Sequence, residues 1–235
     1  MDIQRYSLIE NKYPREIVLL KGRPCQWGQC SFCDYIHDNS EDEVEMIKIN
    51  EAVLEQVTGR LKHLEVINSG SCFELPRKSL EKIKEIIESK GIEHLYLESH
   101  YSYRHRLDEM REFFGIPITF KCGIETFDDY FRNKVLRKGV IFQSPEEVAQ
   151  YFSSICLMVG IQGQTQAMIE RDMALLEQYF ERGCINIYIN NSTAICADES
   201  LIQWFREAYG HLEARENIEI LWNNTDFGVG GDQED

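Results

Sequence analysis

Short apolar runs alternate with longer amphipathic segments along most of this chain. Between the apolar runs, apolar residues recur at the spacing of a helix face, and this recurrence predicts helices. The predicted strands are residues 17–22, 64–68, 94–98, 118–125, 155–160, 185–190 and 218–222, and the predicted helices are residues 50–62, 78–90, 105–114, 145–152, 165–182 and 198–209. Near-continuous apolar strands that alternate with helices predict a parallel sheet covered by helices.

The helix boundaries carry their own signals. Ser144 followed by Pro145 is typical of a helix start, and Gly91, Gly115 and Gly183 stand where helices should end. Six or seven strand-helix units predict an α/β fold, a partial (β/α)6-type parallel barrel, rather than a flat sheet. No linker or repeat interrupts the pattern, so we expect a single domain over residues 1–235 with a short flexible tail from about residue 228.

Net charge and hydropathy indicate which classes of binding partner are disfavoured. The chain carries 40 acidic and 25 basic residues, a net charge of −15, whereas surfaces that bind nucleic acid are usually basic. Local basic groups remain at residues 104–106 and 132–138. No apolar stretch is long enough to span a bilayer, and the N-terminus lacks the apolar segment of a signal peptide. We therefore expect a cytoplasmic protein with no membrane contact, for which nucleic acid is a disfavoured partner.

Three of the eight cysteines, Cys25, Cys30 and Cys33, lie in one loop directly after the first predicted strand. Three thiolates on a four-iron cluster leave one iron open to bind and reduce a further ligand. A zinc site completed by Cys72 or His37 is the alternative for this loop. The other five cysteines stand mostly in apolar surroundings and are interpreted as small buried residues.

In parallel barrels the chemistry is carried by the loops that follow the strand ends. Here these loops are unusually polar or glycine-rich: they include Ser69-Gly70-Ser71, Glu98, Glu125 and the segment 160–165. Each signal alone is weak, since a pair of glycines usually marks a helix entrance. Together, and in this order after three cysteines, they predict a cofactor site.

The order of these loops resembles the radical S-adenosylmethionine (SAM) superfamily over nearly the whole chain. Phe32 precedes Cys33 as an aromatic residue does in that family, although four residues rather than three separate Cys25 from Cys30. The resemblance implies that Cys25, Cys30 and Cys33 bind a [4Fe–4S] cluster whose fourth iron chelates SAM. It also implies reductive cleavage of SAM to a 5′-deoxyadenosyl radical, which abstracts hydrogen from the substrate. An electron donor such as flavodoxin or ferredoxin is implied as a partner.

The resemblance further implies which residues contact SAM. The turn Ser69-Gly70-Ser71 takes the place of the turn that contacts the SAM amino group, although the family's Gly-Gly-Glu is absent. A basic residue at Arg137 is placed to pair with the methionyl carboxylate, and the segment 160–165 resembles the turn beside the adenine. The implied cofactor contacts are Phe32, Ser69, Gly70, Ser71, Glu98, Glu125, Arg137, Gly160 and Gly163. Glu98 stands where it would bind either SAM or the substrate.

The expected substrate is a small molecule, because the chain is acidic and shows no second cysteine group or RNA-binding appendage. Among small members of the superfamily, the sequence is most similar to salvage lyases that act on a free modified nucleobase. Such a substrate needs polar contacts to a guanine-like edge, a diol and a cationic amine. The candidates on strand-end loops are Glu74, His100, Asn190, Asn223 and Asp226.

Two alternatives remain open from the sequence. A radical SAM enzyme acting on tRNA or on another small molecule would keep every cofactor motif. Affinity for tRNA that falls steeply with salt would favour the tRNA reading. A non-enzymatic iron–sulfur or zinc-binding protein would bind metal without cleaving SAM.

Overall fold

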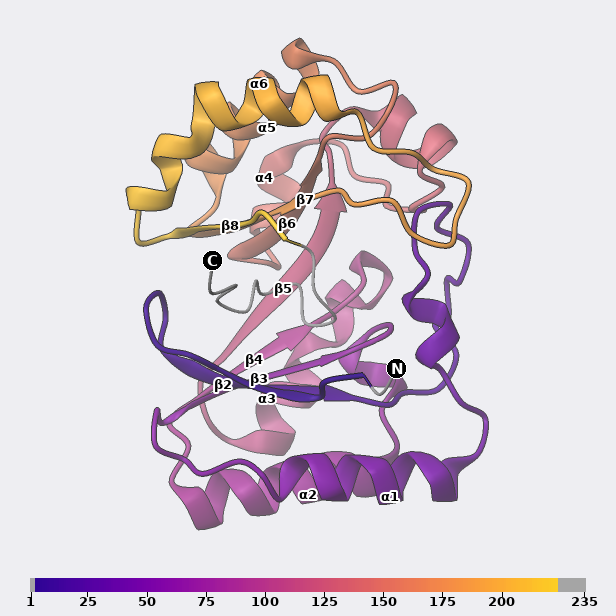
Figure 1. Ribbon diagram of the computed structural model, residues 1–235. Helices are drawn as coiled ribbons and strands as arrows, with labels where there is room; N and C mark the ends of the chain where they lie inside the picture. Colours follow the sequence, from indigo (N-terminus) through magenta and orange to yellow (C-terminus); the bar gives the residue numbers. More distant parts are fainter. Residues whose placement is uncertain (1–2, 224–235) are drawn as a thin grey trace. The chain divides into compact units, whose positions relative to one another are not determined.

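The structure is a computed structural model that describes residues 3–223. The chain divides into two compact units, Met1–Gly28 with Tyr35–Lys121 and Gln29–Asp34 with Cys122–Asp235. The strands succeed one another in the sheet in chain order, from β1 to β8 (Figure 1). Asp226 and the tail expected from about residue 228 lie outside the described residues. The single domain over 1–235 stays a prediction.

The first unit is built on parallel strands with one antiparallel strand at the edge. β1 pairs with β2 antiparallel, whereas β2, β3, β4 and the start of β5 pair in parallel. Every residue of β2 is buried, as a strand covered on both faces requires. The strand bounds are β1 (Tyr6–Ile9), β2 (Arg15–Leu20), β3 (His63–Asn68), β4 (His94–Glu98) and β5 (Ile118–Glu125).

Helices α1 and α2 lie side by side on one face of the first unit's strands (Figure 1). Gly91 and Gly115 end α2 and α3 in the left-handed conformation, with φ of 64° and 71°, as predicted. The helix bounds are α1 (Glu43–Leu54), α2 (Arg77–Lys90) and α3 (Leu107–Phe114), with single 3₁₀ turns at Tyr35–Asp38, Cys72–Glu74 and Tyr101–Arg106.

Two sequence predictions in this unit are wrong. The first helix begins at Glu43 instead of residue 50, because the Asp42 side chain accepts hydrogen bonds from the first-turn amides of Val44 and Glu45. It ends at Leu54, and the residues that follow form a turn. The strand β1 was not predicted, since it is short and only its pairing with β2 makes it a strand.

The second unit continues the pattern with the end of β5 and the parallel strands β6, β7 and β8. Helices α5 and α6 both pack against β6. Ser144 stands at the start of α4 with Pro145 in its first turn, as predicted. The bounds are α4 (Pro145–Ala149), β6 (Ser154–Val159), α5 (Gln166–Tyr179), β7 (Arg182–Ile187), α6 (Glu199–Tyr209) and β8 (Ile218–Leu221), with a π-helical turn at Phe131–Val135 and a 3₁₀ turn at Gly210–Ala214.

Gly183 does not end a helix as predicted, because it lies inside β7. A Cβ at this position would stand 2.5 Å from a methyl carbon of Leu176, so glycine allows β7 to pack closely beneath α5. Arg182, predicted as the last helical residue, is instead the first residue of the strand and forms a buried ion pair with Glu219 on β8. None of the helices within residues 3–223 combines the length and the apolar character needed to cross a membrane.

Asp172 joins α5 to the end of β5. Its Oδ1 accepts a hydrogen bond from the backbone N–H of Phe127 at 2.7 Å. Burial raises the pKa of this carboxyl group from 3.8 to about 7, against the opposing effect of hydrogen bonds from Thr126 and Phe127. In the folded chain the group therefore binds its proton more tightly than in the unfolded chain.

We predict that Asp172→Asn makes stability less dependent on pH. The carboxyl group has a pKa of 3.8 in the unfolded chain and of about 7 in the folded chain. Its contribution to the free energy of unfolding is therefore complete below pH 3.8 and is lost as the pH rises to about 7. The loss amounts to at most ~4 kcal/mol for a shift of this size. Asparagine keeps an acceptor for Phe127 and never ionises. Denaturant unfolding at about pH 5 and pH 8 checks this, and an equal pH dependence in both chains would contradict it.

Candidate functional site

In the first unit, Glu74 stands at the centre of the contacts around Cys25. Its Oε1 accepts hydrogen bonds from the backbone N–H of Gln26 at 2.8 Å and from the hydroxyl of Tyr103 at 3.2 Å. Its Oε2 accepts one from the backbone N–H of Ser71 at 2.5 Å. The carboxylate thus joins the residue after Cys25 to the turn after β3 and to the 3₁₀ turn that follows β4.

Gly70 is required by the close approach of this carboxylate. A Cβ on Gly70 would lie 2.1 Å from Oε2 of Glu74 and 3.4 Å from Cβ of Cys25. Any side chain here would therefore displace the carboxylate. The turn Ser69-Gly70-Ser71 therefore runs close to Cys25, with no room for a side chain between them.

Burial raises the pKa values of two titratable groups beside Glu74, the hydroxyl of Tyr103 and the thiol of Cys72. It raises the pKa of Tyr103 to about 12, and the nearby charge of Glu74 acts in the same direction. It also raises the pKa of Cys72 to about 12, so this thiol stays protonated at neutral pH. The Cys72 thiol is fully buried, whereas the thiols of Cys25, Cys30 and Cys33 are partly exposed.

Two buried polar atoms near the turn after β3 lack hydrogen-bond partners among residues 3–223. They are Nδ2 of Asn39 and Oδ1 of Asn68. The side-chain oxygen of Asn39, in contrast, accepts a hydrogen bond from the hydroxyl of Ser69. Because buried polar groups are nearly always paired, a donor and an acceptor left open beside one turn suit a ligand that carries both kinds of group.

Glu98 ends a chain of buried charges on one face of the first unit's strands. Arg15 pairs with Glu65, and Lys121 pairs with Glu65 through its other oxygen. Nζ of Lys121 also lies 3.5 Å from Oε1 of Glu98. The side chain of Glu98 is 34% exposed, while those of Arg15, Glu65 and Lys121 are at most 9% exposed. Glu98 is therefore the member of the chain that a ligand can reach.

His100 has a structural role in the first unit. Its Nδ1 accepts a hydrogen bond from the backbone N–H of Ser102 at 3.2 Å, which caps the 3₁₀ turn Tyr101–Arg106. Its ring stacks on Trp27 of the cysteine loop (residues 25–33), with ring centres 6.2 Å apart and planes 11° apart.

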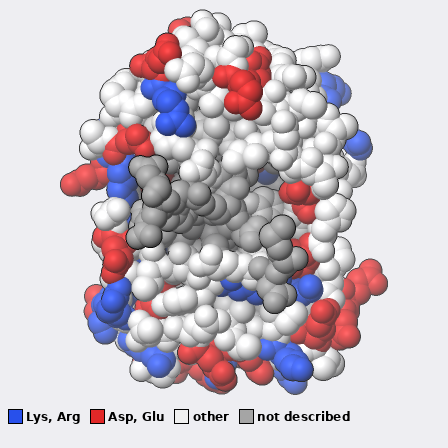
Figure 2. Space-filling model, in the orientation of Figure 1, with Lys and Arg blue, Asp and Glu red and all other residues white. Residues whose placement is uncertain are grey.

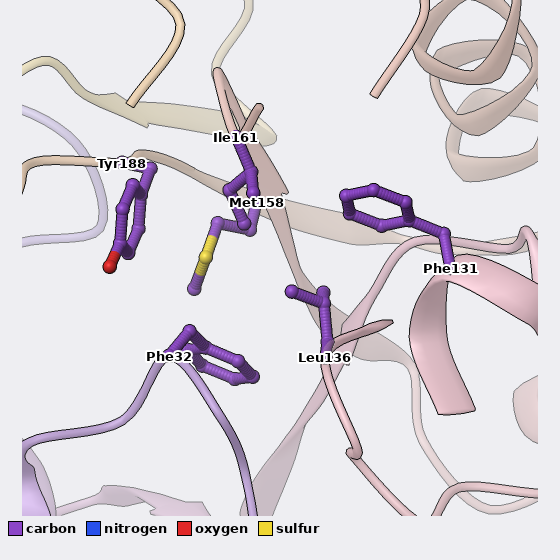
Figure 3. Packing of buried hydrophobic residues seen from close by; sticks show 6 residues of the cluster. All are labelled: Phe32, Phe131, Leu136, Met158, Ile161 and Tyr188. Atoms are coloured by element: carbon purple, nitrogen blue, oxygen red, sulfur yellow. The ribbon is translucent and has the colours of Figure 1, made fainter. Parts of the chain in front are cut away.

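In the second unit, Phe32 holds its part of the cysteine loop. It belongs to an apolar cluster formed by Phe32, Phe131, Leu136, Met158, Ile161 and Tyr188 (Figure 3). The hydroxyl of Ser31 donates to the backbone oxygen of Val135 at 2.7 Å, and Asn191 donates to the backbone oxygen of Phe32 at 2.8 Å. Cys30 and Cys33 pack against the rim of the cluster, and both remain partly exposed, as does Cys25 in the first unit.

Glu125 and Lys138 form an ion pair beside this cluster. Nζ of Lys138 donates to Oε1 of Glu125 at 2.6 Å and lies 5.7 Å from the ring centre of Phe32. Burial lowers the pKa of Lys138, but the negative charges of Glu125 and Cys30 outweigh it and raise the pKa overall. Glu125 adopts a left-handed φ of 65°, which is unusual for a residue with a side chain.

The remaining predicted cofactor residues of this unit lie in two turns. Arg137 has a left-handed φ of 52°, and its exposed guanidinium donates to Oε1 of Gln29 at 3.4 Å. Gly160 and Gly163 both have a φ of 92°, so each needs glycine. The side-chain oxygen of Gln164 accepts hydrogen bonds from the backbone N–H groups of Gly160 and Ile161, at 2.9 Å each, and so closes the turn.

The candidate substrate residues differ in their surroundings. Oδ1 of Asn190 accepts a hydrogen bond from the backbone N–H of Ala197 at 2.7 Å, Asn223 is exposed, and Asp226 lies outside the described residues. Sequence reasoning missed Asn39, Tyr103 and Lys121, for which it offers no local signal. It also missed the bond from Ser71 to Glu74, although the spacing Ser-x-x-Glu typical of a helix start was present.

Among residues 3–223, no group of three or more His, Cys, Asp or Glu side chains is already arranged to hold a metal ion. The radical SAM resemblance implies roles for the cysteines, for the turns after the strands and for Glu98. These roles stay predictions. Each unit supplies partly exposed thiols of the cysteine loop and buried ion pairs, and the first unit also supplies the two unpartnered amide atoms.

Comparison with known proteins identifies relatives of this chain. No protein-family model matches it. An uncharacterized protein of Methanocaldococcus jannaschii is 24% identical over 140 residues, which are 52% of this chain and 38% of that protein. The alignment therefore spans well under two thirds of the archaeal protein.

A solved structure of the queuine lyase from Clostridium spiroforme, bound to SAM and queuine, is similar over nearly the whole chain. It shares 53% sequence identity with a TM-score of 0.95, and the match covers 98% of this chain and 100% of that chain. The predicted fold, a partial parallel barrel of the radical SAM type, is confirmed by this match. The chain belongs to the queuine lyase family of the radical SAM superfamily.

Proposed function

We propose that the protein is a lyase that cleaves the nucleobase queuine and releases 7-aminomethyl-7-deazaguanine (preQ1). The observation that carries the proposal is the match to queuine lyase, at 53% identity and over 98% of this chain. The cysteine loop and the strand-end loops support the same chemistry, because their order along the chain resembles that of the radical SAM superfamily.

We propose that Cys25, Cys30 and Cys33 hold a [4Fe–4S] cluster. Their partly exposed thiols fit this role. When bound, the cluster supplies the electron that cleaves SAM and so generates the radical that attacks the substrate. Phe32 anchors the loop without covering these thiols.

SAM carries an amino group and a carboxylate that this chain can satisfy. The unpartnered Oδ1 of Asn68 fits the ammonium group of the methionyl part, and Nδ2 of Asn39 fits a carboxylate oxygen. In the second unit, Arg137 keeps the role that the superfamily resemblance implies, a pairing with the methionyl carboxylate. The turn at Gly160 and Gly163, fixed by Gln164, presents backbone to the adenine.

Queuine presents a guanine-like edge, a diol and a secondary amine that is cationic at neutral pH. Glu98 suits the amine, because Lys121 supports its carboxylate from the buried side while the outer part is exposed. Asn190, Asn223 and Asp226 suit the base edge and the diol by their side-chain chemistry. Hydrogen abstraction would leave a radical on the cyclopentenediol ring. The carbon–nitrogen bond would then break with both of its electrons going to the protonated nitrogen, so that preQ1 leaves as the amine. The unpaired electron would stay on the ring fragment, which would release a proton and then be quenched by an electron from the donor and a proton.

Radical SAM chemistry also needs an electron donor. Flavodoxin or ferredoxin stays our prediction for the electron donor, and the cytoplasm for the location. On the face shown in Figure 2, Lys and Arg of the described residues stand among Asp and Glu without forming a continuous basic area. The net charge of −15 supports a small substrate over tRNA.

We predict that the anaerobically reconstituted protein forms 5′-deoxyadenosine and preQ1 when given SAM, dithionite and queuine. Cys30→Ala should abolish both products, because two thiolates cannot retain the cluster. Cys196→Ala is the matched control and should keep both. This cysteine lies outside the loop and is exposed, so its prediction as a buried residue is wrong, whereas Cys72, Cys122, Cys156 and Cys184 are buried as predicted. Mass spectrometry of the reaction mixture measures the two products.

Each other outcome has a distinct meaning. Deoxyadenosine without preQ1 would keep the radical chemistry and overturn queuine as the substrate. Affinity for tRNA that falls steeply with salt would then favour the tRNA alternative. Uptake of zinc in place of iron, with no cleavage of SAM, would overturn the enzyme assignment.

We also predict that Arg137→Gln weakens SAM binding. Loss of one charge-assisted pair should raise the dissociation constant of SAM about tenfold. Lys134→Gln removes the same charge from an exposed neighbouring position and should leave the constant unchanged. Titration calorimetry on cluster-loaded protein under anaerobic conditions distinguishes the two. Equal effects of both substitutions would show that only net charge matters and would contradict the assigned contact.

A further inference from the structure

We infer that Glu74 is a positioning residue that holds Cys25 in place for the iron–sulfur cluster, rather than a substrate contact. The inference rests on the proposed function, because it presumes that Cys25 is a cluster ligand. It follows from the contacts of Glu74 inside the first unit, all of which lead to the cysteine loop or to the elements packed against it.

The decisive contact is the hydrogen bond from the backbone N–H of Gln26 to Oε1 of Glu74, at 2.8 Å. This N–H belongs to the peptide unit that Cys25 and Gln26 share, and that unit is planar. Fixing the plane removes one of the two backbone rotations at the Cα of Cys25. The direction in which the Cys25 side chain leaves the backbone is restricted with it.

The second oxygen of Glu74 binds the turn that runs close to Cys25. Oε2 accepts the hydrogen bond from Ser71, and Gly70 gives it room, since a Cβ there would come within 2.1 Å. The same added Cβ would lie 3.4 Å from Cβ of Cys25. One carboxylate therefore fixes both the backbone of Cys25 and the turn that runs close to its side chain.

The bonding of Glu74 argues against a role in substrate binding. Its two oxygens already accept hydrogen bonds from Gln26, Ser71 and Tyr103, and the residue is only 7% exposed. A substrate donor would have to compete with these internal donors. Glu98, by contrast, has an exposed side chain.

Glu16 offers a control with nearly the same chemistry away from the cysteines. It is buried, and it accepts hydrogen bonds from the backbone N–H groups of Thr58 and Gly59, at 2.7 Å each, and from the hydroxyl of Tyr6 at 2.8 Å. Glu16 and Glu74 thus each bind two backbone amides and one tyrosine, and Glu16 also accepts a hydrogen bond from the hydroxyl of Thr58 at 3.1 Å. Replacing either with glutamine removes one buried charge and disturbs a similar set of bonds.

The test compares Glu74→Gln, Glu16→Gln and Tyr103→Phe with the unsubstituted chain. Thermal unfolding of the cluster-free proteins reports stability, and both glutamine variants should lower it to a similar extent. After reconstitution, the rate of iron loss to a chelator reports how firmly the loop holds the cluster. Glu74→Gln should lose iron roughly tenfold faster, the ratio expected for one charge-assisted hydrogen bond, whereas Glu16→Gln should match the unsubstituted chain.

The reduction potential of the cluster gives a second readout, which general destabilisation does not move. Removing a fixed negative charge beside a cluster ligand favours the added electron, so Glu74→Gln should have a more positive potential. Glu16→Gln should leave the potential unchanged. Tyr103→Phe keeps the Glu74 carboxylate and its hydrogen bond from Gln26, so it should increase the rate of iron loss less than Glu74→Gln does. It replaces Glu74→Gln as the test variant if that variant does not fold.

The outcomes separate the two claims. Equal iron loss and equal potentials for Glu74→Gln and Glu16→Gln, in a chain that carries a cluster, would overturn the inference and leave the proposed function standing. An unsubstituted chain that takes up no cluster would overturn the proposed function and the inference together.

Discussion

The cysteine loop imposes the constraint on which the candidate site depends: its thiols must stay reachable while its backbone is held. Hydrogen bonds and packing meet this requirement separately in each unit. In the first, the carboxylate of Glu74 binds the peptide that follows Cys25. In the second, the ring of Phe32 enters an apolar cluster, and Asn191 and Ser31 fix the neighbouring backbone. Since the anchors are backbone groups and one aromatic ring, the cysteine side chains remain partly exposed.

Buried charge is the second organising feature. Burying an ion is costly unless it is paired, and removal of one partner leaves the other uncompensated. Here the buried ions come in connected sets: Arg15 with Glu65 and Lys121 in the first unit, and Glu125 with Lys138 in the second. In the first set, Lys121 also contacts Glu98, whose partly exposed carboxylate a ligand can reach. A polar interior of this kind stabilises the fold little, but it fixes the charges that a polar ligand would meet.

The sequence predicted what depends on local pattern. Continuous apolar runs located β2 to β8, and glycine after an amphipathic run located the ends of α2 and α3. It failed where tertiary contacts decide: β1 is a strand only through its pairing with β2, and Gly183 serves close packing against Leu176. In the site, residue types at the strand ends suggested the chemistry, but they could not reveal which groups a neighbour already occupies. Glu74 and Glu98 look alike in the sequence, and only their contacts separate a buried anchor from a reachable carboxylate.

The central claim is that this protein removes a hydrogen atom from the cyclopentenediol ring of queuine by means of a radical derived from SAM. Its most direct test is the isotopic composition of the 5′-deoxyadenosine formed from queuine that carries deuterium throughout that ring, in ordinary water. The account predicts that deuterium appears in 5′-deoxyadenosine in step with the release of preQ1. Release of preQ1 with 5′-deoxyadenosine that carries no deuterium would contradict it.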